Sequence, residues 1–184
     1  MRERIKRIAA ASLATILVWV GGAEIGAQDR VGDDAKPLVV FLARHAEKAK
    51  TPDDPELSKA GIERARLLAE LLRDAKIDHV HTSDYRRTRD TASPIAKRLG
   101  INPQVYDPSD LPSLLKRLRA TRGKHLVVGH SNTTPEMVKL LGADPGSPIV
   151  ELSEYDRLYI VTVDNDNRAQ SILLRYGEAA PSTD

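Results

Sequence analysis

The sequence has no cysteine and few aromatic residues. Its 184 residues include one Trp, one Phe and five Tyr, so aromatic side chains make up 4% of the chain. The lack of cysteine excludes disulfide bonds, a thiolate nucleophile and a cysteine-ligated metal. The scarcity of aromatic rings argues against the stacking platforms that bind single-stranded nucleic acid. We therefore expect neither a thiol enzyme nor a nucleic-acid-binding protein.

The remaining composition is that of an ordinary globular domain. Apolar residues make up 41% of the chain and charged residues 29%, and the length suits one hydrophobic core. The formal net charge of +2 comes from the first 27 residues, which carry four basic and two acidic side chains. The rest of the chain is formally neutral, so its charge gives no reason to expect binding to nucleic acid or to an anionic membrane.

The first 27 residues have the pattern of a secretory signal peptide. Basic residues near Met1 are followed by an apolar run from Ile8 to Val20 and then by small residues. The uncharged stretch ends at Ala23, short of the ~20 apolar residues that span a bilayer, which makes an uncleaved anchor the less favoured alternative. We expect cleavage after Ala27 or Ala23, a polar linker over residues 28–36, export to the periplasm or medium, and no stable membrane insertion afterwards.

From Pro37 onwards, apolar runs alternate with helical patterns. Strands are predicted at 38–43, 77–82, 103–106 and 125–128, helices at 58–72, 85–99, 111–120 and 134–141, and a hairpin at 157–163 and 169–176. Ser58 is predicted to cap the first of these helices and Gly100 to end the second, and the last helix is predicted to begin with Thr134 as its N-cap and Pro135 as its first residue. This order predicts a three-layer α/β/α domain over 37–177, with a mostly parallel central sheet, a C-terminal antiparallel hairpin and a frayed tail at 178–184.

Three of the predicted strands end in residues suited to phosphate. Arg44-His45 follows the first strand, Ser83–Arg87 follows the second, and Gly129-His130 follows the fourth. The carboxyl ends of parallel strands meet at one edge of a sheet, so these residues should face one crevice. Arginine and protonated histidine stabilise a phosphoryl group in transfer, and a neutral histidine can attack phosphorus to form phosphohistidine. The sequence therefore predicts a phosphate-handling site.

The second predicted helix begins with three arginines, Arg86, Arg87 and Arg89. Cations are disfavoured at a helix N-terminus, so an anion should compensate them. A bound phosphate would meet both the free backbone N–H groups and an arginine fork. The alternative is a solvated basic face with Asp84 and Asp90 as partners.

These segments resemble, in order, the motifs of the histidine phosphatase superfamily, also called the phosphoglycerate-mutase-like family. Residues 42–47 (Leu-Ala-Arg-His-Ala-Glu) are similar to its Arg-His-Gly/Ala signature, with Ala46 at the position where glycine is commoner. Residues 57–65 resemble its Leu-Ser/Thr-x-x-Gly helix start, 82–92 its Ser-x-x-x-Arg segment, and 127–133 its second-histidine segment. The short stretch between Arg87 and His130 is closest to the small phosphohistidine-phosphatase branch, which disfavours mutase activity.

The resemblance implies a role for each site residue. His45 would be the nucleophile, and Arg44, Arg87 and His130 would bind and stabilise the phosphoryl group, with no metal or organic cofactor. Many members carry a Glu after the third strand as general acid, but residues 106–113 contain none. Asp107 is the tentative substitute, although the segment also reads as a turn with Asp110 capping the next helix.

Two interpretations of function follow. The first is an exported phosphatase of phosphomonoesters or phosphoramidates, acting on a small phosphorylated substrate or a phosphoprotein through a phosphohistidine on His45. The alternative is a non-catalytic phosphate-binding or protein-interaction domain, which the missing Glu keeps open. His79 and His81 alternate on one strand and could ligate a metal, but no third ligand stands at suitable spacing, so a structural role is favoured.

Overall fold

The computed structural model describes residues 36–51 and 53–179. The predicted signal peptide and all of the predicted linker except Lys36 lie outside these residues, as do residues 180–184 of the predicted tail. In the described part of the chain, no helix is both long and apolar enough to cross a membrane.

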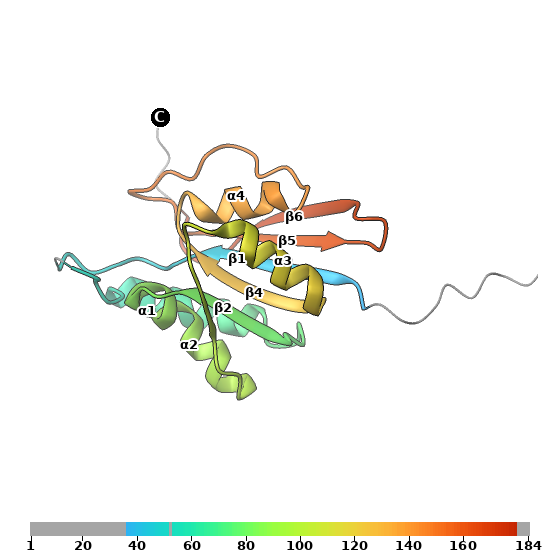
Figure 1. Cartoon of the computed structure of the whole chain (residues 1–184). Helices are drawn as coiled ribbons and strands as arrows, with labels where there is room; N and C mark the ends of the chain where they lie inside the picture. Colours follow the sequence, from blue (N-terminus) through green and yellow to red (C-terminus); the bar gives the residue numbers. More distant parts are fainter. Residues whose placement is uncertain (1–35, 52, 180–184) are drawn as a thin grey trace, which may run out of the picture. The chain divides into compact units, whose positions relative to one another are not determined.

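One six-stranded sheet with the order β3-β2-β4-β1-β5-β6 forms the centre of the domain (Figure 1). Neighbours from β3 to β1 pair in parallel, whereas β5 and β6 pair antiparallel and join the sheet through β1. The strands are β1 (Leu38–Arg44), β2 (His79–Ser83), β3 (Gln104–Tyr106), β4 (Gly123–Gly129), β5 (Arg157–Val163) and β6 (Ala169–Arg175). The predicted mostly parallel sheet with a C-terminal hairpin is confirmed.

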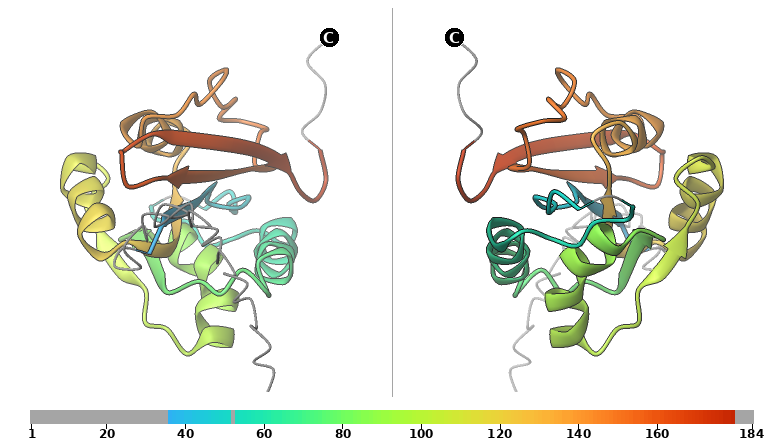
Figure 2. Two further views of the ribbon diagram at one scale, coloured as in Figure 1. Left: turned by 90° about the vertical axis from the view of Figure 1, so that its right-hand side faces the viewer. Right: turned by 90° about the vertical axis from the view of Figure 1, so that its left-hand side faces the viewer.

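Helices cover both faces of the sheet (Figure 2). They are α1 (Lys59–Leu71), α2 (Arg86–Leu99), α3 (Leu111–Thr121) and α4 (Thr133–Leu140). One apolar cluster joins α1 and α2 to residues such as Phe41 and Ala43, and a second joins α3 and α4 to Val40 and Leu42. Successive β1 residues therefore point to opposite layers, as expected for a strand buried on both faces.

The caps explain where the helices begin and end. Ser58 accepts a hydrogen bond from the Gly61 N–H at the start of α1, and Asp110 does the same for Ser113 at the start of α3. Gly100 ends α2 in the left-handed conformation, with φ 65°. These three caps confirm the sequence predictions.

The predicted start of α4 is wrong by two residues. The helix begins at Thr133, with Asn132 as its N-cap, whereas the sequence suggested Thr134 as cap and Pro135 as first helical residue. The Thr133 hydroxyl accepts a hydrogen bond from the His130 N–H at 2.9 Å, and the Thr134 hydroxyl faces the Ala43 carbonyl at 3.5 Å. Both hydroxyls therefore tie α4 to the ends of β4 and β1.

Three histidines lie together on β2 and β4. The rings of His79 and His125 stack with centroids 4.8 Å apart, and His81 Nε2 lies 3.0 Å from His125 Nδ1. No group of three or more His, Cys, Asp or Glu side chains in the described residues is arranged to hold a metal. The His125 ring also bonds the Arg122 carbonyl at 2.7 Å, so the cluster is part of the packing between the sheet and α3.

Candidate active site

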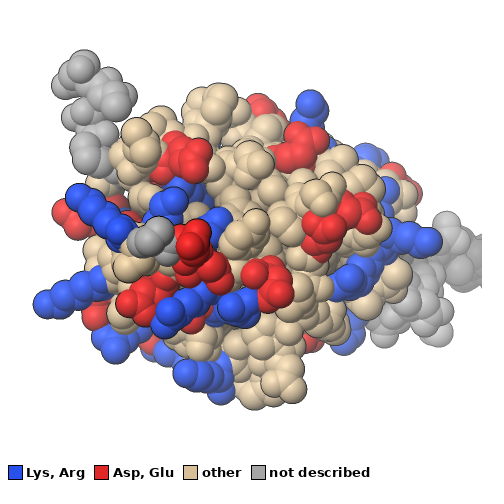
Figure 3. Space-filling model, turned by 60° about the vertical axis from the view of Figure 1, so that its left-hand side comes forward, with Lys and Arg blue, Asp and Glu red and all other residues tan. Residues whose placement is uncertain are grey.

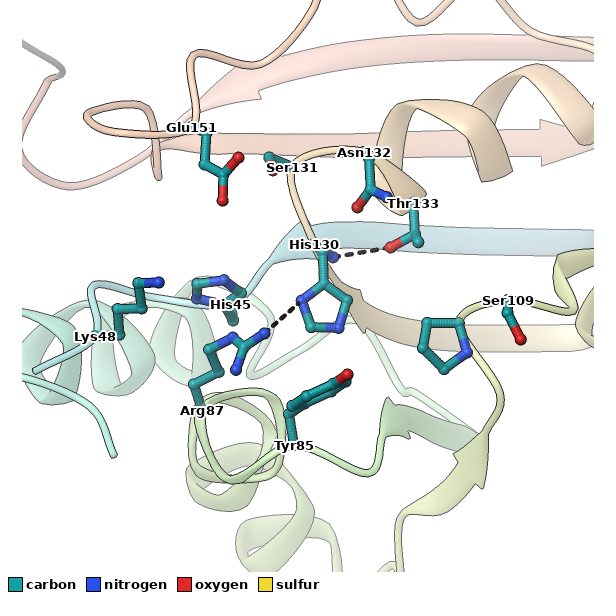
Figure 4. Close-up of a pocket in the computed structure, with 11 residues that line it drawn as sticks. His45, Lys48, Tyr85, Arg87, Ser109, His130, Ser131, Asn132, Thr133 and Glu151 are labelled. Carbon is teal, nitrogen blue, oxygen red and sulfur yellow. Dashed lines mark hydrogen bonds between the residues drawn. The ribbon is translucent and has the colours of Figure 1, made fainter. Parts of the chain in front are cut away.

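A cavity of about 550 Å³ opens at the carboxyl ends of the parallel strands (Figure 4). All three predicted strand exits contribute to it, because Arg44 and Gly129 are register partners and β2 pairs with β4 on the other side. The lining residues are His45, Lys48, Tyr85, Arg87, Pro108, Ser109, His130, Ser131, Asn132, Thr133 and Glu151. The predicted convergence of His45, Arg87 and His130 is therefore present in the structure.

His45 lies at the bottom of this cavity with 3% of its surface exposed. Its Nδ1 is 2.8 Å from the Ala46 carbonyl oxygen, which can only accept, so Nδ1 carries the proton and Nε2 has a free lone pair. Burial lowers the pKa of His45 to about 3 despite the opposing bond to Ala46, and the charges of Arg44, Arg87 and His130 act in the same direction as burial. The ring is therefore neutral and nucleophilic at physiological pH.

The backbone on either side of His45 is fixed by its neighbours. The His45 N–H donates to the Gly129 carbonyl at 2.8 Å, and the Ala46 N–H donates to the Thr91 hydroxyl of α2 at 2.9 Å. Helix α1 approaches so closely that a Cβ on Gly61 would lie 2.1 Å from the Glu47 carbonyl oxygen. Glycine in the motif at 57–65 is thus needed for this contact, and Ala46 fits at the buried position beside the nucleophile.

His130 faces His45, with ring centroids 5.5 Å apart. Its Nδ1 lies 3.4 Å from the Arg87 guanidinium, which can only donate, so Nε2 carries the proton and donates to the Ser83 hydroxyl at 2.8 Å. Ser83 is in turn bonded to the Thr88 hydroxyl at 3.0 Å. Burial, Arg87 and Arg44 lower the pKa of His130 to about 4, so it is neutral until an anion binds beside it.

Arg87 is the arginine of α2 that lines the cavity. Its guanidinium lies 4.3 Å from the centroid of the Tyr85 ring, and its buried Nε has no hydrogen-bond partner within the described chain. An unpaired buried N–H costs roughly 1–3 kcal/mol. An oxyanion bound between His45 and His130 would supply the missing acceptor.

All three arginines of the α2 N-terminus lie near carboxylates, and Arg87 Nη1 is 3.9 Å from Asp54. Arg89 pairs with Asp84 and Arg86 Nε lies 3.9 Å from Asp90, as in the alternative that the sequence left open. Arg86 also pairs with Glu56 at 2.7 Å, which the sequence did not suggest. Asp54 accepts a hydrogen bond from the Arg86 N–H at 2.8 Å, so a carboxylate occupies part of the helix N-terminus where a phosphate was one of the two expected partners. Basic and acidic side chains are interspersed over the face shown in Figure 3.

Arg44 adjoins the nucleophile but directs its guanidinium at a distant loop. Its two terminal nitrogens donate to the carbonyls of Glu154 at 2.9 Å and Glu151 at 2.7 Å, and the group stacks on Tyr155 at 4.0 Å. Its Nε is buried and has no partner in the described residues. Direct phosphate binding by Arg44 stays a prediction, and this buried Nε–H is one donor that remains for it.

The carboxylate of Asp107 is not among the groups that line the cavity. It is exposed and accepts hydrogen bonds from the Ser109 N–H at 2.8 Å and the Ser109 hydroxyl at 2.6 Å. These bonds lower the pKa of Asp107, which disfavours the protonated form that a general acid needs. The segment thus forms the turn that the sequence also suggested, and the acid role of Asp107 stays a prediction.

Several lining residues were not singled out from the sequence as site residues. Tyr85 and Asn132 lie inside recognised motifs, so their closeness in the sequence to Arg87 and His130 could have identified them. Glu151 follows α4 in a segment with no motif, and only the fold brings it to the cavity. The structure therefore adds residues at the mouth rather than at the base of the site.

The arrangement suits phosphoryl transfer to His45 Nε2. The neutral His45 ring supplies a lone pair and Arg87 supplies a fixed positive charge. A bound anion would raise the pKa of His130, and protonation would give His130 a second N–H donor and a positive charge. The N-terminus of α4 borders the cavity and adds the positive end of its dipole. These groups would stabilise the charge of a transferring phosphoryl group, which is the main demand of that reaction.

Comparisons with known proteins agree with this geometry. Residues 40–108 match the Histidine phosphatase superfamily (branch 1). The protein named "Probable phosphoglycerate mutase GpmB" from Yersinia pestis (strain Pestoides F) is 36% identical over 78 residues, covering 39% of this chain and 36% of that protein. The chain thus spans well under half of the length of this curated relative.

Three solved structures share the fold. The protein histidine phosphatase SixA complexed with tungstate is 21% identical, with 75% of this chain and 97% of that chain covered and a TM-score of 0.61. The alpha-ribazole phosphatase from Shigella flexneri is 15% identical, with 76% of this chain and 96% of that chain covered and a TM-score of 0.60. The mycobacterial glucosyl-3-phosphoglycerate phosphatase is 14% identical, with 77% of this chain and 100% of that chain covered and a TM-score of 0.61. At these identities the likeness concerns the fold alone. The segment 40–108, which carries the first three motifs, is thus similar to the histidine phosphatase superfamily (branch 1), and the fold agrees with that similarity.

Proposed function

We propose that this chain is an exported phosphatase that hydrolyses a phosphomonoester or phosphoramidate through a phosphohistidine on His45. The observation that carries the proposal is the state of the His45 ring. Its Nδ1–H is bonded to the Ala46 carbonyl and its pKa is about 3, so a neutral Nε2 stands in a cavity with Arg87 and His130. A ring held in this way has the one tautomer that can attack phosphorus through Nε2.

The substrate class follows from the cavity and from the relatives. The cavity is lined mostly by polar side chains and is open to solvent, which suits a small phosphorylated molecule or an exposed phosphorylated side chain. Two structural relatives are named as phosphatases of small phosphate esters and one as a protein histidine phosphatase. Both kinds of substrate therefore belong in the first screen.

Export rests on the sequence pattern of residues 1–27. A basic start, a short apolar run and small residues before Ala27 are the features that direct secretion. Expression of the full chain followed by cell fractionation tests this directly. The mature protein should be found outside the cytoplasm with a new N-terminus after Ala27 or Ala23, and an intact chain in the cytoplasm would contradict export.

Turnover of an aryl phosphate and of a phosphoramidate by the purified chain tests the activity. The wild type should hydrolyse at least one of them, His45→Asn should be inactive, and a chelator should change nothing. Equal and negligible turnover in both proteins, with phosphate still bound, would instead support the non-catalytic anion-binding alternative. Loss of activity in the chelator would point to metal-assisted hydrolysis.

A further inference from the structure

Glu151 is the single carboxylate among the residues that line the cavity. It belongs to the segment between α4 and β5, more than 100 residues from the nucleophile in the sequence. In Figure 4 its carboxylate points into the cavity from the side opposite Arg87 and Tyr85. No motif of the sequence singles out this residue, and the fold alone brings it to the mouth of the site.

The turn that carries Glu151 is held from both sides. Arg44 donates to the backbone carbonyls of Glu151 and Glu154, so the residue preceding the nucleophile fixes the turn directly. The Glu154 carboxylate accepts a hydrogen bond from the Val150 N–H at 2.9 Å and binds Arg157 through two nitrogens, at 2.6 and 3.0 Å. The Glu151 backbone is therefore anchored to both β1 and β5.

Glu154 itself cannot serve as the acid. Burial would raise the pKa of Glu154, but hydrogen bonds from Arg157, the Val150 N–H and Arg175 outweigh burial and lower the pKa to about 2. Asp107 is held by Ser109, and Asp110 caps α3. Each of these three neighbouring carboxylates already has a structural role, whereas the Glu151 side chain faces the cavity.

The direction of attack places the leaving group near Glu151. In a phosphoryl transfer the nucleophile and the leaving atom lie roughly in line across phosphorus. Because His45 is buried at the base of the cavity, a leaving oxygen must point to the mouth, where Lys48 and Glu151 are exposed. Of these two, a carboxylic acid is the group that commonly protonates a leaving oxygen near neutral pH.

We propose that Glu151 is the general acid of this site, in place of the Glu that is missing after β3. The assignment rests on the proposed phosphatase function. His45 Nε2 attacks phosphorus as the bond to the leaving oxygen breaks, and the Glu151 carboxyl proton passes to that oxygen, releasing an alcohol. Water then attacks the phosphohistidine and gives a proton to the Glu151 carboxylate, which releases phosphate and restores neutral His45 and protonated Glu151.

Glu151→Gln tests this role because it keeps the backbone carbonyl that Arg44 binds. The measured quantity is kcat/KM, which reports the first irreversible step, for an aryl phosphate and for an alkyl phosphate of poorer leaving ability. An alkyl leaving group needs the proton and an aryl group needs it far less. We expect a ~10²–10³-fold loss with the alkyl ester and a loss under ~10-fold with the aryl ester.

Glu136→Gln is the matched control, since Glu136 is exposed on α4 and does not line this cavity. It should affect both esters equally and only slightly. In Glu151→Gln, slow hydrolysis of the phosphoenzyme should also produce a burst of the aryl product in stopped-flow, which a purely structural residue would not cause.

A loss in Glu151→Gln that is the same for both esters would overturn the assignment. So would a leaving-group-dependent loss in Asp107→Asn with none in Glu151→Gln. Absence of turnover in the wild type is a different result, because it would remove the proposed phosphatase function rather than the choice of acid.

Discussion

The histidines stacked on β2 and β4 should make the domain sensitive to acid. His81 is 1% exposed, its Nε2 is bonded to His125, and its Nδ1 is buried without a partner in the described residues. Burial, with smaller contributions from the nearby His125, Arg117 and His79, lowers the pKa of His81 to about 3. At a pH between this value and the ordinary histidine pKa of the unfolded chain, His81 is therefore protonated in the unfolded chain and neutral in the folded protein.

The sign and size of the effect follow from this difference in pKa. The unfolded chain has an ordinary histidine pKa of about 6.5, so above that value neither state binds the proton and the stability is intact. As the pH falls from 6.5 towards 3, the unfolded state alone binds it and the free energy of unfolding decreases by up to ~1.4 kcal/mol per pH unit. Between pH 7.5 and 5.0, His81 alone should remove about 2 kcal/mol.

The assay is urea unfolding at both pH values for the wild type and His81→Leu. The pH-induced loss of unfolding free energy should be about 2 kcal/mol smaller in the variant, whatever its stability at pH 7.5. Val80→Ala serves as control, because it creates a cavity in the neighbouring core position and should lower stability equally at both pH values. An identical pH-induced loss in wild type and His81→Leu would refute the assignment of a buried neutral His81.

Two further predictions concern the surroundings of the nucleophile. Gly61→Ala places a Cβ 2.1 Å from the Glu47 backbone oxygen, so it should cost ~3 kcal/mol and lower Tm by about 5–10 °C in calorimetry. In Gly100→Ala the new Cβ meets nothing within 4 Å, so only the left-handed backbone should lower the free energy of unfolding, by ~1–2 kcal/mol. An equal loss of stability in Gly61→Ala and Gly100→Ala would contradict the close contact at Gly61. Lys48→Met removes an exposed charge at the cavity mouth. In steady-state assays it should raise KM about 3–10-fold while kcat changes little, and a fall in kcat alone would contradict a role of Lys48 in substrate binding.

Local patterns were sufficient to predict most of the fold. The unbroken apolar run of β1, the Ser58 and Asp110 caps and Gly100 after α2 each act within a few residues, and each lies where the sequence predicted. The start of α4 was predicted wrongly because Thr133 and Thr134 bond to the ends of β4 and β1. Ala43 is far from Thr134 in the sequence and only the fold brings the two together, whereas His130 is a local partner of Thr133 that residue type alone did not reveal.

The base of the site was predictable in the same way, since strand order brings His45, Arg87 and His130 to one edge of the sheet. The partners of Arg44 were not, because its acceptors lie more than 100 residues away in a turn without regular structure. Likewise, the Asp54 carboxylate at the start of α2 comes from a loop more than 30 residues upstream. Contacts of this kind depend on loop conformation, which composition and periodicity do not specify.

Trapping of the phosphoenzyme tests the central claim most directly. The purified chain is mixed with a ³²P-labelled substrate, quenched within milliseconds in alkali and analysed for base-stable, acid-labile label by peptide mapping. The wild type should carry the label on His45, at Nε2, and His45→Asn should carry none. Turnover without any labelled intermediate, or equal labelling of His45→Asn, would contradict covalent catalysis by this histidine.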